Sequence, residues 1–474
     1  MSIRLRPLVI ALAIAGISAQ ASASDLLQAY TLARQSDPQF AAAEAQKNAQ
    51  VEGVAISRSA LLPQISADAT FGDSSSHSTG NTVVAGAPIP ANTSRDDSRS
   101  RGTGVNLRQS IYDRSNYTQL GASKARARQA EATYDSVTDA LIVRVADAYF
   151  NVLTAIETLA ASRAQERSVK RQLDQAEKRL EVGLAPITDV HEARARYDSA
   201  RADAILQVAA LDDAYEALTE ITGERMTDLK GLAADFRPEN ADTRTVEDWV
   251  TIAMASNPSL QASTEALAAA EKDVSTARAA YWPTLSATAN YGDSARWGQS
   301  DRREPLPQNL TEFGNASNGP SYGFTLSVPL FTGFATQSRL RQALFQRDAA
   351  ADQLEQQKRA ITRLTRGAFR NLVAGQAEVE ARRLAVVSAQ AAYEAGEAGL
   401  EVGTRSIVDV LIAQQALFQA QRDSARARHA FLVNILRLRQ AAGILEVSDL
   451  EMVNRFLVAD ANAAAADTTF DPKN

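Results

Sequence analysis

The 474-residue chain contains no cysteine and only three histidines. Without cysteine the chain has no disulfide, although an exported protein would be allowed one, and it has no thiol that could accept a lipid. His77, His191 and His429 are too far apart to have the spacing of metal ligands. A phosphate-binding loop, a dinucleotide-binding glycine motif and a G-x-S-x-G motif are also absent. We therefore expect neither an enzyme nor a protein that needs a cofactor or metal.

Long apolar runs are absent as well. No segment after the N-terminus approaches 18 consecutive apolar residues, which excludes a transmembrane helix. The N-terminus has Arg4 and Arg6, then an apolar run from Leu8 to Ile17, then the small residues Ala21-Ser22-Ala23. This order predicts a secretory signal peptide over residues 1–23. The exported chain is then either soluble, or it crosses a membrane as β-strands.

Positive charge is in deficit. The chain has 50 Lys and Arg against 56 Asp and Glu, a formal net charge of −6. Removing residues 1–23 takes away two arginines and no acid, which brings the charge to −8. An acidic exported chain is a poor partner for nucleic acid or for an anionic membrane surface.

The most informative feature that is present is a repeat at an offset of 220 residues. The segment Glu181-Val182-Gly183, with Ile187 and Asp189-Val190 after it, returns as Glu401-Val402-Gly403, with Ile407 and Asp409-Val410. This offset is far longer than the repeat of about 20–50 residues in a solenoid, so it indicates a duplicated half-protein. We predict a first repeat over 24–223, a linker over 224–245, a second repeat over 246–443 and a C-terminal tail over 444–474.

Proline divides the mature chain by secondary structure. It is absent from 91–185, 187–237 and 330–471, which are rich in Ala, Leu, Gln, Arg and Glu. This composition favours helices. From about 115 to 181 one helix could run for about 100 Å. We expect Ala-rich coiled coils, and a disordered end to the Ala- and Asp-rich tail.

Four short segments alternate apolar and polar residues, which is typical of strands with one apolar face. They lie at about 62–73, 103–113, 283–293 and 321–332. Two belong to each repeat. The segments between them, roughly 74–100 and 294–320, are rich in Ser, Gly, Asn, Thr and Asp, so we predict exposed loops there.

Four strands cannot stand alone in lipid, because the edges of an open sheet would leave backbone groups unpaired. Three copies of the chain would supply twelve strands, an even number that suits a closed transmembrane barrel. A soluble sheet that packs on helices is the alternative, and alternation alone does not decide between them. Export and the length of the helices favour the barrel.

Each repeat has one break in its longest helical stretch. Gly183 and Gly403 are placed as glycines are at a helix C-terminus, and a new helix is expected from about 187 and 407. Ser406 and Asp409 fit a capping box, and acids near a helix start are favoured by its dipole. On local physics alone, helix capping explains these aspartates better than a functional role does.

The chain resembles the TolC-type outer-membrane efflux channels, from the signal peptide to about residue 450. The most specific elements are Val182-Gly183-Leu184 with Ile187–Val190, and Val402-Gly403-Thr404-Arg405 with Ile407–Val410. The absence of a lipid-accepting cysteine resembles TolC-type channels more than the lipid-anchored branch. The resemblance implies a mostly helical homotrimer in a Gram-negative outer membrane. Its twelve-stranded β-barrel would continue as a helical tunnel through the periplasm.

The resemblance also implies roles for residues at the two breaks, which would be the periplasmic tips near 182–190 and 402–410. Arg405 would link to Thr188 and Asp189, and Asp409 would form an acidic ring at the constriction. The residues implied to meet a periplasmic adaptor are Val182, Gly183, Leu184, Val402, Gly403 and Thr404.

Two positions depart from the family pattern. Leu400 replaces a tyrosine that helps to latch the tip, and Ile412 replaces a second ring aspartate. Glu192 occupies the position in the first repeat that corresponds to Ile412. It could return negative charge to the mouth, but a solvated glutamate is the better expectation.

The function expected is therefore a passive exit duct that works with an adaptor and an inner-membrane pump, without a cofactor. Drug efflux and type I protein secretion compete as its task. A soluble periplasmic coiled-coil adaptor is the alternative from another class, and the alternating strands oppose it. A diffusion porin would need more strands per chain and no long helices.

Overall fold

The computed structural model describes residues 24–84, 87–233, 236–238, 244–303 and 309–458. The predicted signal peptide and the tail from 459 onwards lie outside the described residues. The chain forms two compact units. We call residues 44–134 and 258–359 the strand unit, and the remainder, 1–43, 135–257 and 360–474, the helical unit.

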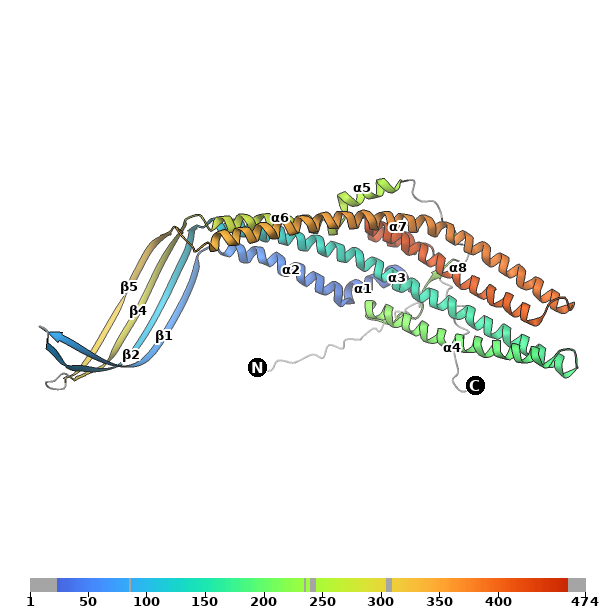
Figure 1. The fold of residues 1–474 in the computed structure, drawn as a ribbon, viewed down its shortest axis with the longest axis horizontal. Coiled ribbons are helices and arrows are strands. Elements are labelled where there is room, and N and C mark those ends of the chain that lie inside the picture. The colour runs from blue at the N-terminus through green and yellow to red at the C-terminus, as the bar shows by residue number, and fades with distance from the viewer. Residues whose placement is uncertain (1–23, 85–86, 234–235, 239–243, 304–308, 459–474) are drawn as a thin grey trace, which may run out of the picture. The chain divides into compact units, whose positions relative to one another are not determined.

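The strand unit contains one four-stranded antiparallel sheet (Figure 1). Its strands are β1 (Gln64–Val84), β2 (Ala87–Tyr112), β4 (Thr284–Arg303) and β5 (Asn309–Ser327), in the order β1-β2-β4-β5. Each repeat supplies one hairpin, and the two hairpins join where β2 pairs with β4. Helices α2 (Pro38–Ser59) and α6 (Pro258–Ala279) precede the two hairpins along the chain.

The strands are longer than the alternating segments, and the prediction of loops over 74–100 and 294–320 was wrong. Those segments continue the strands, with a ladder that pairs Ser74 with Ser98 and Ser294 with Ser317. The hydroxyls of each of these two pairs lie 3.0 Å apart. Such cross-strand pairs stabilise a sheet whose two faces are both polar. Alternation detects strands with one apolar face only, so it missed this part.

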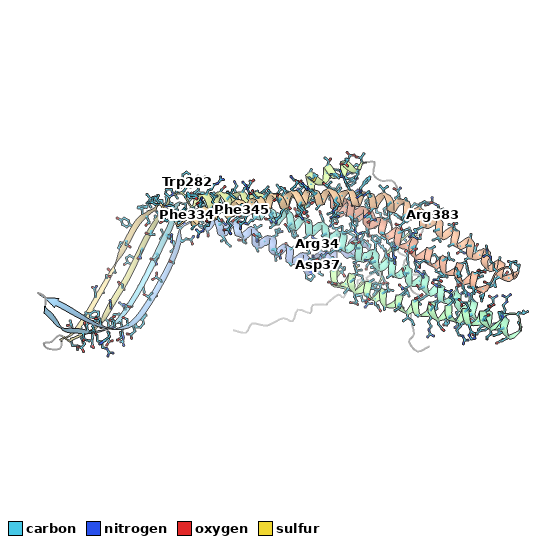
Figure 2. The ribbon with its side chains drawn as sticks, viewed as in Figure 1. Arg34, Asp37, Trp282, Phe334, Phe345 and Arg383 are labelled. Carbon is cyan, nitrogen blue, oxygen red and sulfur yellow. The ribbon has the colours of Figure 1, made fainter. Side chains whose placement is uncertain are left out.

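The end of the sheet that adjoins the helices has an apolar face. Register places Ile65, Val105, Tyr291 and Phe324 on the same side, and all four are exposed in the single chain. Beside the helices, Trp282, Phe334 and Phe345 add further aromatic side chains (Figure 2). Such an apolar face with aromatic residues at its border is the pattern of strands that meet lipid.

The helical unit is built from helices of very different length. They are α1 (Leu26–Ser36), α3 (Arg114–Glu181), α4 (Ile187–Thr222), α5 (Val246–Ser256), α7 (Ala335–Glu401), α8 (Ile407–Ala442) and α9 (Val447–Asn454), of which α3 and α7 begin in the strand unit. The uninterrupted helix predicted over about 115–181 is confirmed by α3. Among the described residues, no helix combines the length and the apolar character needed to span a membrane.

Short elements join the middle of the helical unit. Strand β3 (Gly231–Leu232), from the linker, pairs with β6 (Leu457–Val458), which follows α9. The start of the tail is therefore folded, since α9 and β6 lie within the segment 444–458. Trp249 of α5 packs on Leu438 and Ala442 of α8 in one buried cluster.

Candidate functional site

The candidate site is the pair of helix turns at 182–190 and 402–410, which we call the first tip and the second tip. In the first tip, Gly183 follows α3 with a φ of 75°. Its N–H donates to the carbonyl of Leu180 at 2.9 Å, and the N–H of Leu184 donates to Arg179 at 2.8 Å. These two bonds are those of a Schellman motif, which closes a helix C-terminus around a left-handed residue.

The second tip repeats this backbone. Gly403 has a φ of 74°, its N–H donates to Leu400 at 3.3 Å, and the N–H of Thr404 donates to Gly399 at 2.8 Å. The helices that follow begin at Ile187 and at Ile407, as predicted. The recurring Val-Gly and Asp-Val residues thus encode the same turn twice.

One apolar cluster holds both tips together. Val169, Leu173 and Ala176 of α3, Val190 and Ala193 of α4, and Ile407 and Leu411 of α8 form its buried part. Leu400 of α7 packs against it. All four helices therefore share one core next to the turns. Leu400, which replaces a tyrosine of the family pattern, serves as an apolar contact here.

The residues at the outer end of the turns are exposed. Val182 is 68% exposed, Leu184 74% and Val402 74%. Isolated exposed apolar residues are common, but here they gather at the two turns while the shared cluster lies behind them. The turns therefore expose a group of apolar side chains.

Arg405 lies on the surface of the second tip. A Cβ added at Gly399 would lie 2.6 Å from its Cγ, so the arginine side chain rests directly against the end of α7. Within the described residues of this single chain, its guanidinium makes no hydrogen bond or ion pair. The structure of one copy therefore does not join Arg405 to Thr188 or Asp189, which lie exposed and half-buried at the start of α4.

Asp409 completes the capping box that the sequence predicts. Its Oδ2 accepts from the N–H of Ser406 at 3.1 Å and from the Ser406 hydroxyl at 2.8 Å. The Asp409 N–H donates to the same hydroxyl at 3.2 Å. The hydroxyl and N–H of Ser406 hold the pKa of the Asp409 carboxyl below its ordinary value, and the charge of Arg405 adds to this. The carboxylate is exposed and ionised at neutral pH, so capping and a charged ring are compatible roles.

The first tip has no such cap. The residue before α4 is Pro186, which has no side-chain hydrogen-bond acceptor. Glu192, the position considered for a second charge, pairs with Arg196 at 3.2 Å on the same helix. Arg196 also donates to Gln415 of α8 at 3.3 Å. Ile412 is 52% exposed.

A series of polar contacts between α3 and α8 was not foreseen from the sequence. From the middle of the helices towards the tips, the pairs are Asp147–Arg437, Thr154–His429, Glu157–Arg428, Gln165–Arg422 and Ser168–Gln414. This ladder joins the first repeat to the second along both helices. From the sequence alone each of these residues is a charged or polar member of a predicted helix, and its partner is not apparent.

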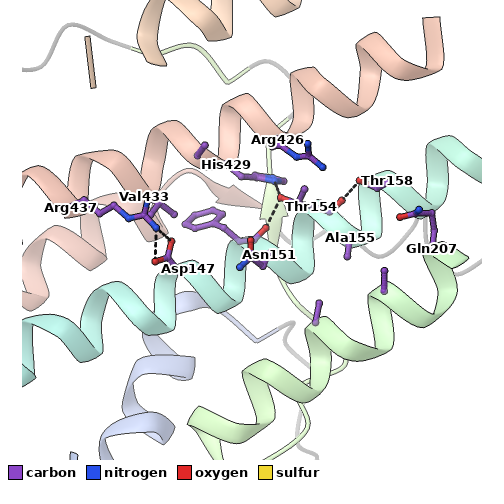
Figure 3. Close-up of a pocket in the computed structure, with 14 residues that line it drawn as sticks. Asp147, Asn151, Thr154, Ala155, Thr158, Gln207, Arg426, His429, Val433 and Arg437 are labelled. Carbon is purple, nitrogen blue, oxygen red and sulfur yellow. Dashed lines mark hydrogen bonds and ion pairs between the residues drawn. The ribbon is translucent and has the colours of Figure 1, made fainter. Parts of the chain in front are cut away.

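His429 is a buried member of this ladder, beside a cleft of about 410 Å³ between α3, α4 and α8 (Figure 3). The Thr154 hydroxyl donates to the carbonyl of Phe150 at 2.7 Å, so it accepts from Nδ1 of His429 at 2.8 Å. Nε2 lies 3.4 Å from Glu157. Burial raises the pKa of Glu157, but His429 and Arg428 outweigh it and the pKa is lowered. No group of metal-ligating side chains is found among the described residues.

Closer to the tips, a second polar layer crosses between the repeats. Gln172 of α3 donates to Glu397 of α7 at 3.4 Å, and the hydroxyl of Tyr393 donates to the same carboxylate at 2.5 Å. Gln414 of α8 is fully buried and donates to Ser168. These bonds hold α7 and α8 against α3, next to the apolar cluster and on its side away from the turns.

Comparisons with known proteins agree with this arrangement. The family described as outer membrane efflux protein matches residues 29–224 and again residues 249–444. The two matches have the same offset as the internal repeat. Together they cover most of the chain.

Known relatives extend over nearly the whole chain. It is 35% identical to outer membrane protein TolC of Vibrio cholerae serotype O1, over 95% of this chain and 98% of that protein. It is 32% identical to TolC of Escherichia coli strain K12, over 99% and 91%. The alkaline protease secretion protein AprF of Pseudomonas aeruginosa is 29% identical, over 91% and 87%.

Solved structures share the fold. The outer membrane channel CmeC of Campylobacter jejuni superposes with a TM-score of 0.70 at 18% identity, over 92% of this chain and 90% of that one. The outer membrane protein VceC of Vibrio cholerae does so with a TM-score of 0.67 at 18% identity, over 88% and 96%.

Proposed function

The chain belongs to the outer membrane efflux protein family, and we propose that its two tips form the gate of a trimeric exit duct. It is a TolC-type channel of the Gram-negative outer membrane, an exit duct for efflux or type I secretion. The relatives reported above are channels and a secretion protein, so the soluble adaptor is discarded as the alternative. The duct works passively, without a cofactor and without a reaction of its own.

In the proposed assembly three copies complete a twelve-stranded barrel. A single sheet of four strands leaves β1 and β5 as edges, and its apolar face is exposed in the single chain. Pairing β5 of one copy with β1 of the next would satisfy both edges and turn the apolar face to lipid. The helices of three copies would then enclose the periplasmic tunnel.

The observation that carries the gate is the apolar cluster shared by α3, α4 and α8 with Leu400. Because it makes the two tips of one copy a single body, the second tip can be restrained through contacts on the first. Arg405 makes no hydrogen bond or ion pair within its own chain among the described residues, so we place its link to Thr188 and Asp189 between neighbouring copies. Three such links would hold the tips around the axis.

Their strength suits a gate. Exposed ion pairs are worth about 0.2–1 kcal/mol each, so one or two links in each of three copies total about 0.6–6 kcal/mol. A partner must supply about 5.5 kcal/mol of differential binding to move a two-state gate from about 1:99 to 99:1. An adaptor that grips three tips could supply this. We assign its contact surface to the exposed residues of both turns, Val182, Gly183, Leu184, Val402, Gly403 and Thr404.

The test of the gate is the single-channel conductance of Arg405→Ala in planar bilayers. We expect a higher conductance than that of the unchanged protein, because the links between copies are lost. Arg383→Ala is the control, since Arg383 is an exposed arginine of α7 outside the tips and pairs with Glu380 at 2.7 Å within that helix (Figure 2). A conductance of Arg405→Ala equal to that of the control would reject the role of Arg405.

The acidic ring is tested by ion selectivity. Three Asp409 carboxylates around one axis would attract cations and repel anions. Asp409→Asn should therefore reduce the cation selectivity, so that the reversal potential measured in a salt gradient moves towards zero. Ser406→Ala is the control, because it removes the capping hydroxyl and keeps the carboxylate. If both variants changed selectivity equally, the shape of the cap rather than the charge would set it.

Drug efflux and protein secretion are separated by a deletion strain. Its drug susceptibility and its secreted proteins would each be compared with those of the parent. Loss of secreted proteins with unchanged susceptibility assigns the duct to secretion, and the reverse assigns it to efflux. Co-purification after cross-linking at Val182 or Val402 would identify the adaptor and the pump.

A further inference from the structure

Three segments that are far apart in the sequence meet at Ser24. Its carbonyl accepts from the N–H of Lys230 at 3.0 Å, and Ser24 forms a parallel bridge with Leu229. Two residues on, Leu26 donates its N–H to the side chain of Asn454 at 3.1 Å. The start of the described chain, the linker between the repeats and helix α9 are therefore held at one place in the helical unit.

Tyr149 of α3 fixes this meeting point from the inside. It is fully buried, and its hydroxyl lies 3.1 Å from the carbonyl of Ser24 and 2.7 Å from that of Lys230. Burial raises the pKa of Tyr149, and the nearby Asp25 carboxylate raises it further. The phenol therefore stays protonated and donates to both carbonyls. These two hydrogen bonds hold Ser24 against the linker.

The amide nitrogen of Ser24 has a partner of its own. It donates to the carbonyl oxygen of Asp228 at 2.5 Å. Beside it, the ammonium of Lys230 pairs with the carboxylate of Asp25 at 3.3 Å. Burial raises the pKa of Asp25, but the hydrogen bonds from Gln28, Asn454 and Lys230 outweigh burial and the pKa is lowered, so Asp25 is ionised.

Ser24 is also the residue that directly follows the expected cleavage site, Ala21-Ser22-Ala23. We propose that removal of the signal peptide creates the ligand of this site, namely the α-ammonium group of Ser24 bound by the carbonyl oxygen of Asp228. Hydrolysis consumes one water: the Ala23–Ser24 C–N bond breaks, Ala23 leaves as a carboxylate, and Ser24 keeps the nitrogen as an ammonium. α-Amino groups have a pKa of about 7.7–8.0, so this group is charged at neutral pH.

Processing therefore strengthens the contact between Ser24 and the Asp228 carbonyl. A hydrogen bond from an ionised donor is roughly twice as strong as one between neutral groups. The three segments are joined most firmly only in the processed chain, which couples export to the final folding of the helical unit.

The test uses the chemistry of an N-terminal serine, whose amino alcohol is cleaved by periodate to an aldehyde when the amine is accessible and unprotonated. In the purified trimer at neutral pH, we expect Ser24 to react about tenfold more slowly than in denatured protein, which corresponds to about 1.4 kcal/mol. Intact mass gives both the identity of the first residue and the extent of reaction. A first residue other than Ser24, or equal rates in both states, would overturn the proposal.

A pair of insertion variants separates the amine from the general stability of the trimer. Ser-Gly placed between Ala23 and Ser24 keeps the cleavage site and an N-terminal serine but moves the amine two residues away. The same dipeptide after Asn474 is the control. The first variant should react quickly with periodate and lose about 2–4 °C in the midpoint of heat dissociation. That loss should shrink as the pH rises above the pKa of the amine, whereas a loss equal to that of the control at every pH would contradict the proposal.

Discussion

The first and second tips have the same backbone and are completed by different side chains. Both close α3 or α7 with a Schellman motif around a left-handed glycine, and both start the next helix at an isoleucine. The first then has Pro186 at the cap and no capping side chain, whereas the second has Ser406 and Asp409 in a capping box. The second tip also carries Arg405 against the small Gly399.

This difference separates what the turn needs in order to fold from what the gate needs in order to work. The turn needs glycine, an apolar residue facing the shared cluster, and a helix start, and both repeats have kept these. An exposed cation and an ordered carboxylate occur at the second tip only. We propose that the shared turn serves folding in both tips, and that Arg405 and Asp409 add the charged groups of the gate at the second tip.

The largest effects should come from the shared cluster. Leu173→Ala in the first repeat or Leu411→Ala in the second removes a buried leucine, at a cost of about 2–5 kcal/mol. Because one cluster serves both tips, either change should speed hydrogen exchange in peptides from both tips. Ile412→Ala, at the exposed neighbouring position, is the control, and about 0.5 kcal/mol or less is expected of it. Faster exchange confined to the mutated repeat would show that the tips are independent.

The glycines should behave alike in the two tips. Gly183→Ala and Gly403→Ala force a side chain into the left-handed region, at about 1–2 kcal/mol each. A Cβ at either position would meet nothing within 4 Å, so the backbone alone sets the cost. Limited trypsin digestion, which can cut at Arg179 and Arg405 beside the turns, would report the loosening. A marked inequality between the two variants would mean that the turns are not equivalent.

The caps should behave differently. Ser406→Ala removes a hydroxyl that caps α8, at about 1 kcal/mol. Pro186→Ser would place a hydroxyl three residues before Asp189 and so repeat the arrangement in the first tip. Its gain should be largely offset by the greater freedom of the unfolded chain, about 0.4–1 kcal/mol. Hydrogen exchange in the first turn of α8 measures the effect of Ser406→Ala, and exchange in the first turn of α4 measures that of Pro186→Ser. A large gain of stability from Pro186→Ser would contradict this expectation and would show that the first tip lacks a stabilising cap.

The capping carboxylate also makes a prediction about pH. The pKa of Asp409 is lowered in the folded state, so its contribution to stability is present above the unfolded value, 3.8, and is lost as the pH falls through the folded value. The first turn of α8 should therefore lose protection against hydrogen exchange below about pH 3.8. Asp409→Asn should abolish that step, and its persistence in this variant would assign it to another carboxylate.

The local features of the tips could be predicted from the sequence, because each depends on a few neighbouring residues. Gly183 and Gly403 ended their helices where expected, and Ser406 with Asp409 formed the expected capping box. The strands could be predicted only in part. Where both faces are polar, as around Ser98, sequence alternation is lost and only pairing with β1 and β4 shows the strand.

Contacts between the repeats could not be predicted in this way. The pairs of α3 with α8, such as Glu157 with Arg428, join residues that are hundreds of positions apart. Nothing in the sequence around His429 distinguishes a buried histidine from an exposed one. The proposed link of Arg405 is harder still to predict, because it would join two copies, and the sequence of one copy does not show how copies are aligned.

The smallest expected effect tests how the second tip holds Arg405. A Cβ at Gly399 would lie 2.6 Å from Cγ of Arg405 and 3.3 Å from Oγ1 of Thr404, so Gly399→Ala must displace the arginine without removing its charge. A Cβ at Gly396, one turn earlier on α7, would meet Val410 at 3.8 Å, which is an ordinary contact. Both changes raise helix propensity equally, so Gly396→Ala is a matched control. We expect Gly399→Ala to raise single-channel conductance, by less than Arg405→Ala does, and Gly396→Ala to leave it unchanged. If the two glycine variants conduct alike, the position of Arg405 against α7 does not matter to the gate, and its charge alone must account for the difference between the tips.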